Sequence, residues 1–220
     1  SGFALGDLVE ECRSKGLSGF EFAAGIPGSV GGAVCGNAGA YGCSVGERLV
    51  EAEVWSPQCG VRRVPPEFFN FVYRDSVLKH EEGIVFWARF RVEPGRQEQI
   101  EAAMQANLKR RLERLPPPEL PSAGSFFKNL PPERPGERRR AAGLFLEQAG
   151  VKGLRVGGAQ VYEKHANIIV NRGGATARDV HTLAQQMKAR VQERFGITLE
   201  EEARYLGTIT WFSRGLRGFT

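Results

Sequence analysis

A glycine-rich stretch at residues 25–42 places the strongest constraint on how this chain can fold. Seven of its eighteen residues, GIPGSVGGAVCGNAGAYG, are glycine. Helices and strands of ordinary length are weakened by that composition, because glycine loses more conformational freedom on folding than any other residue. Bare backbone can, however, approach a ligand closely and direct successive amides at an anion. The stretch therefore predicts either an anion- or cofactor-binding loop or a set of tight turns.

The spacing of the glycines excludes two common nucleotide-binding motifs. Gly25, Gly28, Gly31 and Gly32 do not follow the pattern G-x-G-x-x-G of dinucleotide-binding folds. The stretch also lacks the Gly-Lys-Ser/Thr ending of a phosphate-binding loop. The residues alone leave the cofactor loop and the tight turns equally open.

Composition narrows the class of protein. The chain has 220 residues, 41% of them apolar and 25% charged, which is typical of one large or two modest globular domains. No apolar run approaches the roughly 18 residues of a membrane span, so we expect a cytoplasmic protein that does not enter the membrane. The four cysteines and three histidines show neither zinc-ligand spacing nor disulfide-scaffold density. We therefore expect reduced thiols and no metal site.

The net charge of +5 suits an anionic ligand. The densest basic run, Arg138–Arg140, lies beside Glu133 and Glu137 and has no interleaved aromatic residues. A solvated helix face explains this run better than a nucleic-acid groove. We expect no nucleic-acid partner.

Periodicity predicts a mixed α+β fold with antiparallel hairpins, because strands and helices do not alternate regularly. The expected helices are a short one from Leu5 that stops before Gly16, a long one with the stripe Ile100, Met104, Leu108, Leu112 and Leu115 that Pro116–Pro118 ends, one ending near Gly150, and one from Val180 to Phe195 before Gly196. The expected strands are Val50–Ser56, Val61–Val64, Ile84–Val92, Asn167–Asn171 and Tyr205–Phe212. Within Ile84–Val92 we expect Ile84, Phe86, Ala88, Phe90 and Val92 to share the buried face.

Four further segments follow the glycine-rich stretch in a recognisable order. They are Tyr73-Arg74-Asp75-Ser76, the run PSAGSFFKN at 121–129, Gly157-Gly158-Ala159-Gln160 with His165-Ala166-Asn167, and the run LEEEAR at 199–204. Together the five segments resemble those of the UDP-N-acetylenolpyruvoylglucosamine reductase (MurB) family of bacterial cell-wall synthesis. Leu130 and Ala203 depart from the family, which usually has Pro and Val there. The short span between Arg74 and Ser125 is similar to the second subtype of the family, because it leaves no room for the tyrosine-bearing loop of the first.

The resemblance implies an FAD-binding fold of the vanillyl-alcohol oxidase type, present here as its second lobe, plus a MurB-like C-terminal substrate-binding domain. We expect residues 1–117 and 200–220 to form the FAD-binding lobe and residues 118–199 the substrate domain. The family's N-terminal FAD lobe has no counterpart in this chain, so we expect the chain to be a piece of a longer protein.

The resemblance also implies an activity: reduction of UDP-N-acetylglucosamine enolpyruvate to UDP-N-acetylmuramate by NADPH through FAD. The implied catalytic residues are Arg74 for electrostatic stabilisation, Ser125 as proton donor to C2, and Glu202 as the carboxyl that works with the arginine. The implied cofactor-binding residues are Ile26, Pro27, Gly28, Ser29, Val30, Gly31, Gly32, Asn37, Gly39, Tyr41 and Gly42. The implied substrate-binding residues are Tyr73, Lys128, Asn129, Gln160 and Arg204.

Each of these residues also has a simpler structural explanation. Ser125 could be a turn or helix-cap serine, and the three adjacent glutamates could be a solvated acidic run. His165 and Asn167 are expected to bond backbone near a strand. Another flavoprotein of the same fold, or a non-catalytic fragment that binds the nucleotide sugar, are the alternatives to the reductase.

Overall fold

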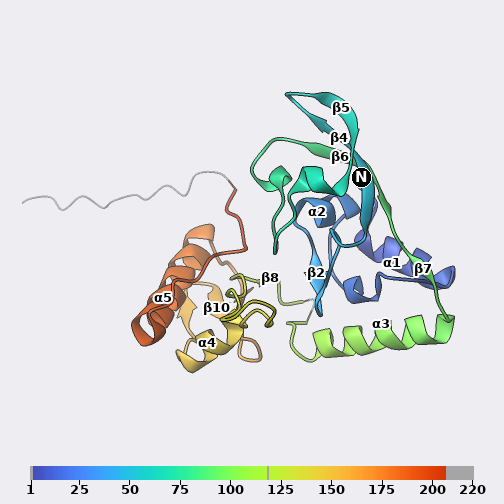
Figure 1. The fold of residues 1–220 in the computed structure, drawn as a ribbon. Helices are drawn as coiled ribbons and strands as arrows, with labels where there is room; N and C mark the ends of the chain where they lie inside the picture. The colour runs from blue at the N-terminus through green and yellow to red at the C-terminus, as the bar shows by residue number, and fades with distance from the viewer. Residues whose placement is uncertain (1, 118, 207–220) are drawn as a thin grey trace, which may run out of the picture. The chain divides into compact units, whose positions relative to one another are not determined.

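The computed structural model describes residues 2–117 and 119–206, and the chain divides into two compact units, Ser1–Glu113 and Arg114–Thr220 (Figure 1). Both units combine helices with antiparallel strands, which confirms the predicted α+β class. The boundary lies at 113/114, four residues before the expected one. Among the described residues, no helix has both the length and the apolar character needed to cross a membrane.

The first unit is built from short sheets and three α-helices. Its elements are α1 (Leu5–Ser14), β1 (Leu17–Ser18), α2 (Val30–Cys35), β2 (Gly39–Ala40), β3 (Cys43–Ser44), β4 (Leu49–Ser56), β5 (Gly60–Val64), β6 (Ile84–Phe90), β7 (Glu93–Pro94) and α3 (Gln97–Leu112), with 3₁₀ turns η1 (Glu21–Ala23), η2 (Pro66–Phe69) and η3 (Val77–Lys79). The sheets have the orders β5-β4-β6, β1-β7 and β2-β3, all antiparallel. The predicted first helix and the β4–β5 hairpin are confirmed.

The burial pattern of β6 corrects a prediction. Val85 is buried, whereas Ile84 and Phe86 are 53% and 46% exposed. The register against β4 shifts at this point, because two neighbouring residues of β4 pair with Trp87 and Val85 and leave Phe86 as a bulge. A bulge adds one residue to one strand and thereby reverses the alternation of its side chains. The expected single buried face was therefore wrong for Ile84 and Phe86.

Helix α3 ends earlier than its apolar stripe suggested. Ile100 and Met104 are buried in the core of the first unit, but Leu112 is 77% exposed. Leu115 packs instead against a small cluster in the second unit. The proline at 116 disfavours helical backbone at the residue before it, so the last predicted turn does not form. The stripe was predicted correctly only for the part that faces the core.

The described residues of the second unit form one antiparallel sheet and two α-helices. Its elements are β8 (Ser122–Ser125), α4 (Ala142–Gln148), β9 (Arg155–Val156), β10 (Ala159–Val161), β11 (Ile168–Asn171) and α5 (Ala177–Phe195), with the strand order β8-β11-β10-β9. Helix α5 begins with a capping box between Thr176 and Asp179 and ends at Gly196, whose φ is 68°. Apolar side chains of α4, α5 and β10 form the core. The predicted helix ends are confirmed, and the strand predicted at Asn167–Asn171 is observed at Ile168–Asn171.

The end of the chain differs from the expected domain assignment in its described part. The bridge between Phe127 and Glu201 pairs residues 200–203 with 126–128 inside the second unit. The expected assignment of 200–220 to the FAD lobe therefore does not describe this segment. The predicted strand Tyr205–Phe212 lies mostly outside the described residues, and its first two residues are not in a strand.

Candidate active site

The glycine-rich stretch folds into very short elements separated by turns. Helix α2 has six residues, and β2 and β3 have two each. Ser29 is the N-cap of α2, and its hydroxyl accepts a hydrogen bond from the amide of Gly32 at 3.1 Å. The amide of Val30 donates to the carbonyl of Phe3 at 2.8 Å. Two of the amides expected to face a cofactor are thus used within the protein.

Two glycines show that one part of the stretch is open to its surroundings and another part is tightly packed. Gly28 is exposed with a φ of 121°, and a Cβ there would meet nothing within 4 Å. At Gly39, by contrast, a Cβ would lie 2.4 Å from the carbonyl oxygen of Cys43. Close pairing of β2 with β3 therefore needs glycine at 39. The region around Gly28 presents bare backbone to its surroundings, as a cofactor-binding surface requires.

Asn37 orients the loop itself. Its side chain is buried, donates to the carbonyl of Val72 at 2.8 Å and accepts from the amide of Gly46 at 3.0 Å. A side chain with both groups engaged in this way holds two loops together. The structure thus gives Asn37 a structural role beside the expected cofactor contact.

Tyr41 is the exposed aromatic ring of the stretch. It has a φ of 55°, and 48% of the residue is exposed. Its hydroxyl donates to the carbonyl of Asn107 in α3 at 3.2 Å, and the guanidinium carbon of Arg110 lies 5.8 Å from the ring centroid. A fixed, exposed ring next to Gly42, where an added Cβ would also meet nothing within 4 Å, fits a large planar cofactor such as a flavin dinucleotide.

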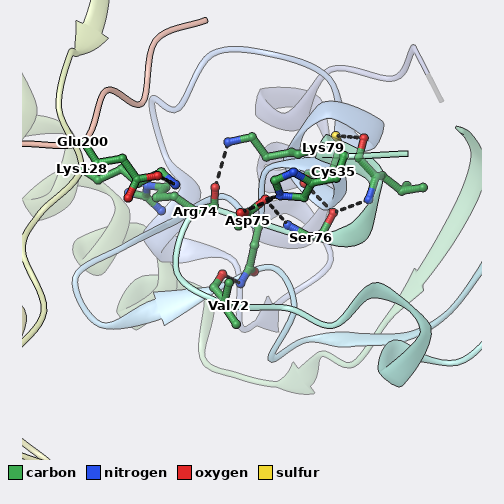
Figure 2. A network of polar contacts seen from close by, with 11 residues as sticks. Cys35, Val72, Arg74, Asp75, Ser76, Lys79, Lys128 and Glu200 are labelled. Atoms are coloured by element: carbon green, nitrogen blue, oxygen red, sulfur yellow. Dashed lines mark hydrogen bonds and ion pairs between the residues drawn. The ribbon is translucent and has the colours of Figure 1, made fainter. Parts of the chain in front are cut away.

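Arg74 sits on a tight turn that contacts the glycine-rich stretch (Figure 2). Its Nη2 donates to the carbonyl of Gly39 at 2.5 Å, and its guanidinium carbon lies 5.2 Å from the ring centroid of Tyr73. The φ of Arg74 is 57°, the left-handed region, which costs a non-glycine residue about 1–2 kcal/mol. A strained backbone held by several contacts is typical of functional sites.

The serine of the same motif anchors this turn. Ser76 is buried, and its hydroxyl donates to the carbonyl of Cys35 at 2.7 Å. The carbonyl at the end of helix α2 thereby gains a partner. The motif and the glycine-rich stretch, more than thirty residues apart in sequence, form one structure within the first unit.

In the second unit, Ser125 and Glu202 lie on paired segments. Ser125 is exposed at the end of β8, opposite Ile168 of β11. The amide of Glu202 donates to the carbonyl of Phe126, the neighbour of Ser125, at 2.8 Å. Two of the three expected catalytic residues are therefore adjacent in backbone although 77 positions separate them in sequence.

The run of three glutamates divides among different partners. Glu200 pairs with Lys128, with 2.5 Å between Oε1 and Nζ (Figure 2). Glu201 accepts from Lys188 at 3.3 Å and from Gln185 at 3.1 Å, both on α5. These contacts give Glu200 and Glu201 roles in orienting Lys128 and in fastening the segment to α5. Lys188 and Gln185 were not predicted as partners from the sequence, although their i, i+3 spacing places them on one helix face.

The remaining expected substrate-binding residues have varied surroundings. The Asn129 side chain accepts from the amide of Ala142 at 3.1 Å and so caps helix α4. Gln160 accepts from Arg172 at 3.0 Å, and Arg204 is exposed. Asn129 is thus engaged in the fold, whereas the Lys128 side chain is 14% exposed and lies beside a glutamate whose side chain is 70% exposed.

His165 and Asn167 bond backbone near a strand, as predicted. The side-chain amide of Asn167 makes two hydrogen bonds to the backbone of Phe127: its Oδ1 accepts from the Phe127 amide and its Nδ2 donates to the Phe127 carbonyl. His165 accepts the amide proton of Asn167 on Nδ1 at 3.2 Å. Burial, and secondarily the charge of Arg114, lowers the pKa of His165. A neutral imidazole agrees with this acceptor role.

Comparison with known families defines the class of protein first. Residues 1–64 match the FAD binding domain, so the first unit carries a flavin-binding domain. Residues 116–206 match the C-terminal domain of UDP-N-acetylenolpyruvoylglucosamine reductase. The chain belongs to the UDP-N-acetylenolpyruvoylglucosamine reductase family.

Individual relatives agree with this assignment. The chain is 42% identical to the reductase of Solibacter usitatus and 41% identical to that of Nostoc sp., over 94% of its length in both cases. It is similar to the crystal structure of the reductase (MurB) from Thermus caldophilus, with a TM-score of 0.76, 37% identity, and coverage of 91% of this chain and 69% of that one. The chain spans 70% of the Solibacter protein and 60% of the Nostoc protein.

Proposed function

We propose that this chain is part of an enzyme that reduces the enolpyruvyl ether of UDP-N-acetylglucosamine to a lactyl ether, with NADPH as reductant and FAD as cofactor. The product is UDP-N-acetylmuramate, a precursor of peptidoglycan. The observation that carries the proposal is the pairing of the Ser125 and Glu202 segments in a domain of this reductase family.

The glycine-rich stretch would hold the cofactor. The open backbone around Gly28 and the exposed ring of Tyr41 support this role. When bound, FAD supplies a hydride acceptor for NADPH and a hydride donor for C3 of the enolpyruvyl group. With the Val30 and Gly32 amides bonded within the protein, the contacts of this stretch would be mainly close packing, from Ile26 to Gly42.

Arg74 would stabilise the negative charge that develops during the reaction. Addition of hydride at C3 moves an electron pair toward C2 and the substrate carboxylate. A guanidinium stays charged at all relevant pH values and can bind a carboxylate through two parallel hydrogen bonds. Its anchorage to Gly39 supports the role, because a preorganised charge needs no reorientation in the transition state.

Ser125 would deliver the proton to C2, which completes the saturated product. A serine hydroxyl is a weak acid, so its proton must be replaced from a neighbour or a water molecule. Glu202 would act as a hydrogen-bond donor to the developing dianion when protonated. Lys128 and Arg204 would bind the anionic groups of the nucleotide sugar, with Tyr73, Asn129 and Gln160 around the substrate.

The first test is spectroscopic. We expect the full-length protein to purify yellow and to oxidise NADPH steadily only when the enolpyruvyl sugar nucleotide is present. A colourless protein would contradict the proposal, as would a rate of NADPH oxidation that is the same with and without the sugar nucleotide. Binding of the sugar nucleotide without turnover would instead support a non-catalytic binding protein.

The second test separates the two half-reactions by stopped flow. Ser125→Ala should leave flavin reduction by NADPH unchanged and slow reoxidation by the substrate by about 10²-fold or more. Ser122→Ala, on the same strand, is the matched control and should change neither rate. Equal losses in both half-reactions would remove Ser125 from its assigned role.

A further inference from the structure

Arg74 occupies the second central position of a two-residue turn. Val72 and Asp75 exchange two backbone hydrogen bonds of 3.2 Å, so Tyr73 and Arg74 form the turn between them. The positive φ of Arg74 is unfavourable for a side chain with a Cβ. Contacts outside the turn must therefore stabilise this geometry.

One of these contacts comes from a lysine that no motif singles out. The ammonium of Lys79 donates to the carbonyl of Arg74 at 2.9 Å (Figure 2). A hydrogen bond from a charged donor is about twice as strong as a neutral one. It fixes the peptide plane that follows Arg74 and so supports, together with the two Val72–Asp75 bonds, the turn in which Arg74 has a positive φ.

Lys79 is itself held in place. It is the last residue of η3, whose first turn is capped by Ser76, because the Ser76 hydroxyl accepts from the amide of Leu78 at 3.3 Å. The same hydroxyl donates to Cys35, and the thiol of Cys35 lies 3.4 Å from the carbonyl of Leu78. These contacts hold the η3 turn against the end of α2. The backbone of Lys79 is therefore held in place where its side chain donates to the Arg74 carbonyl.

The side-chain position of Arg74 depends on this backbone. Its guanidinium meets the carbonyl of Gly39, which the tight β2–β3 pairing also fixes. If Arg74 relaxed to a negative φ, its Cα–Cβ bond would turn relative to the loop and the guanidinium would leave Gly39. The charged hydrogen bond and the backbone strain are similar in size, so loss of the bond removes a stabilisation comparable to the strain that Arg74 carries.

We propose that Lys79 is a positioning residue, which holds Arg74 in the left-handed conformation that directs its guanidinium at the site. The inference rests on the proposed function, in which Arg74 stabilises the charge that develops on the substrate. Lys79 acts through Arg74 and needs no contact of its own with substrate or cofactor.

The test uses Lys79→Met in the full-length, flavin-loaded protein. We expect flavin reduction by NADPH within about twofold of the wild type and reoxidation by the enolpyruvyl sugar nucleotide slowed about 10- to 100-fold. Lys79→Arg should recover most of the lost rate, because a guanidinium can also donate to the carbonyl. Lys15→Met is the matched control: it removes the same charge from an exposed ion pair with Glu11 in the same unit.

A crystal structure of Lys79→Met gives a readout independent of activity. We expect Arg74 to leave the positive-φ region and to lose its hydrogen bond to Gly39. If Lys79→Met does not hold flavin, Lys79→Gln, which keeps an uncharged donor, should slow only reoxidation, by about 3- to 10-fold.

Several outcomes would overturn the inference. They are an unchanged reoxidation rate in Lys79→Met, an unchanged Arg74 in its structure, and equal slowing of both half-reactions in Lys79→Gln or Lys79→Arg. If the wild type does not reduce the enolpyruvyl compound, the proposed function fails, whereas a normal wild type with a normal Lys79→Met overturns this inference alone.

Discussion

Asn167 pairs with Phe127 as a neighbouring strand would. Its Oδ1 accepts from the Phe127 amide at 2.9 Å, and its Nδ2 donates to the Phe127 carbonyl at 2.8 Å. Both residues are buried. Asn167→Ala would leave a buried amide and a buried carbonyl without partners, so we expect a loss of about 2–4 kcal/mol in the free energy of unfolding. Urea denaturation measures the loss, and Gln186→Ala, exposed on α5, should stay within about 0.5 kcal/mol of the wild type.

Substitution of Gly39 tests whether the close pairing of β2 with β3 in the glycine-rich stretch is needed for stability. Gly39→Ala places a Cβ 2.4 Å from the carbonyl oxygen of Cys43, and the β2–β3 pair must separate. We expect a loss of at least about 2 kcal/mol in stability and a lower flavin content of the purified protein. Gly6→Ala, inside α1 with nothing near the added methyl, should stabilise the protein by up to about 1 kcal/mol. A Gly39 variant with normal stability and flavin content would show that the close approach has no structural importance.

The lowered pKa of His165 predicts that the free energy of unfolding decreases as the pH is lowered. Burial lowers the pKa of His165 in the folded state below its usual value of about 6.5, so between the two pKa values the unfolded chain binds more protons than the folded one. Stability therefore falls as pH is lowered from about 6.5, by at most about 1.4 kcal/mol per pH unit for one group. His165→Gln should make the stability curve flatter between pH 5 and 7, as measured by denaturant midpoints, and an unchanged slope would contradict the assignment.

The three adjacent glutamates should have separable effects. Glu201→Gln loses the contact with Lys188 and should cost about 1 kcal/mol in stability while leaving KM and kcat near normal. Glu200→Gln removes the negative charge that pairs with Lys128, so we expect KM for the sugar nucleotide to change by about 3- to 10-fold. Glu202→Gln should lower kcat by about 10²-fold with little change in stability. Thermal melts and steady-state kinetics on the three variants distinguish these outcomes, and a kcat loss confined to Glu200→Gln would move the catalytic role to that residue.

Helices and hairpins that depend on nearby residues in the sequence were predictable. Features that depend on how distant strands pair were not. The capped helix α5 and the β4–β5 hairpin follow from apolar spacing, an N-cap and glycine stops. The phase of β6 does not, because the bulge at Phe86 exists only through its register with β4. The sequence predicted one turn too many for α3, because the apolar stripe continues past the end of the helix to Leu115, which packs in the second unit.

Some residues of the candidate site were predictable from the sequence, and others became apparent only in the folded structure. Motif order predicted Arg74, Ser125 and Glu202, and their joint action stays a prediction. Spacing carries no information on Lys79, since an ordinary lysine acquires its partner only when η3 is fastened to the end of α2. Nor could the sequence separate Glu200 from Glu201, because three identical side chains in a row differ only in which neighbours the fold provides.

The sequence by itself determined the mixed fold class, most of the helices and strands, and the family, because these depend on residue order and on local backbone preferences. Only the tertiary structure decided which amides of the glycine-rich stretch are already bonded, that Arg74 adopts a left-handed backbone against Gly39, and that the Ser125 and Glu202 segments pair. The physical reason is that the hydrogen bonds from Val30 to Phe3, from Arg74 to Gly39 and from Glu202 to Phe126 join residues 27 to 76 positions apart, so the folded geometry sets them and they leave no local pattern in the chain.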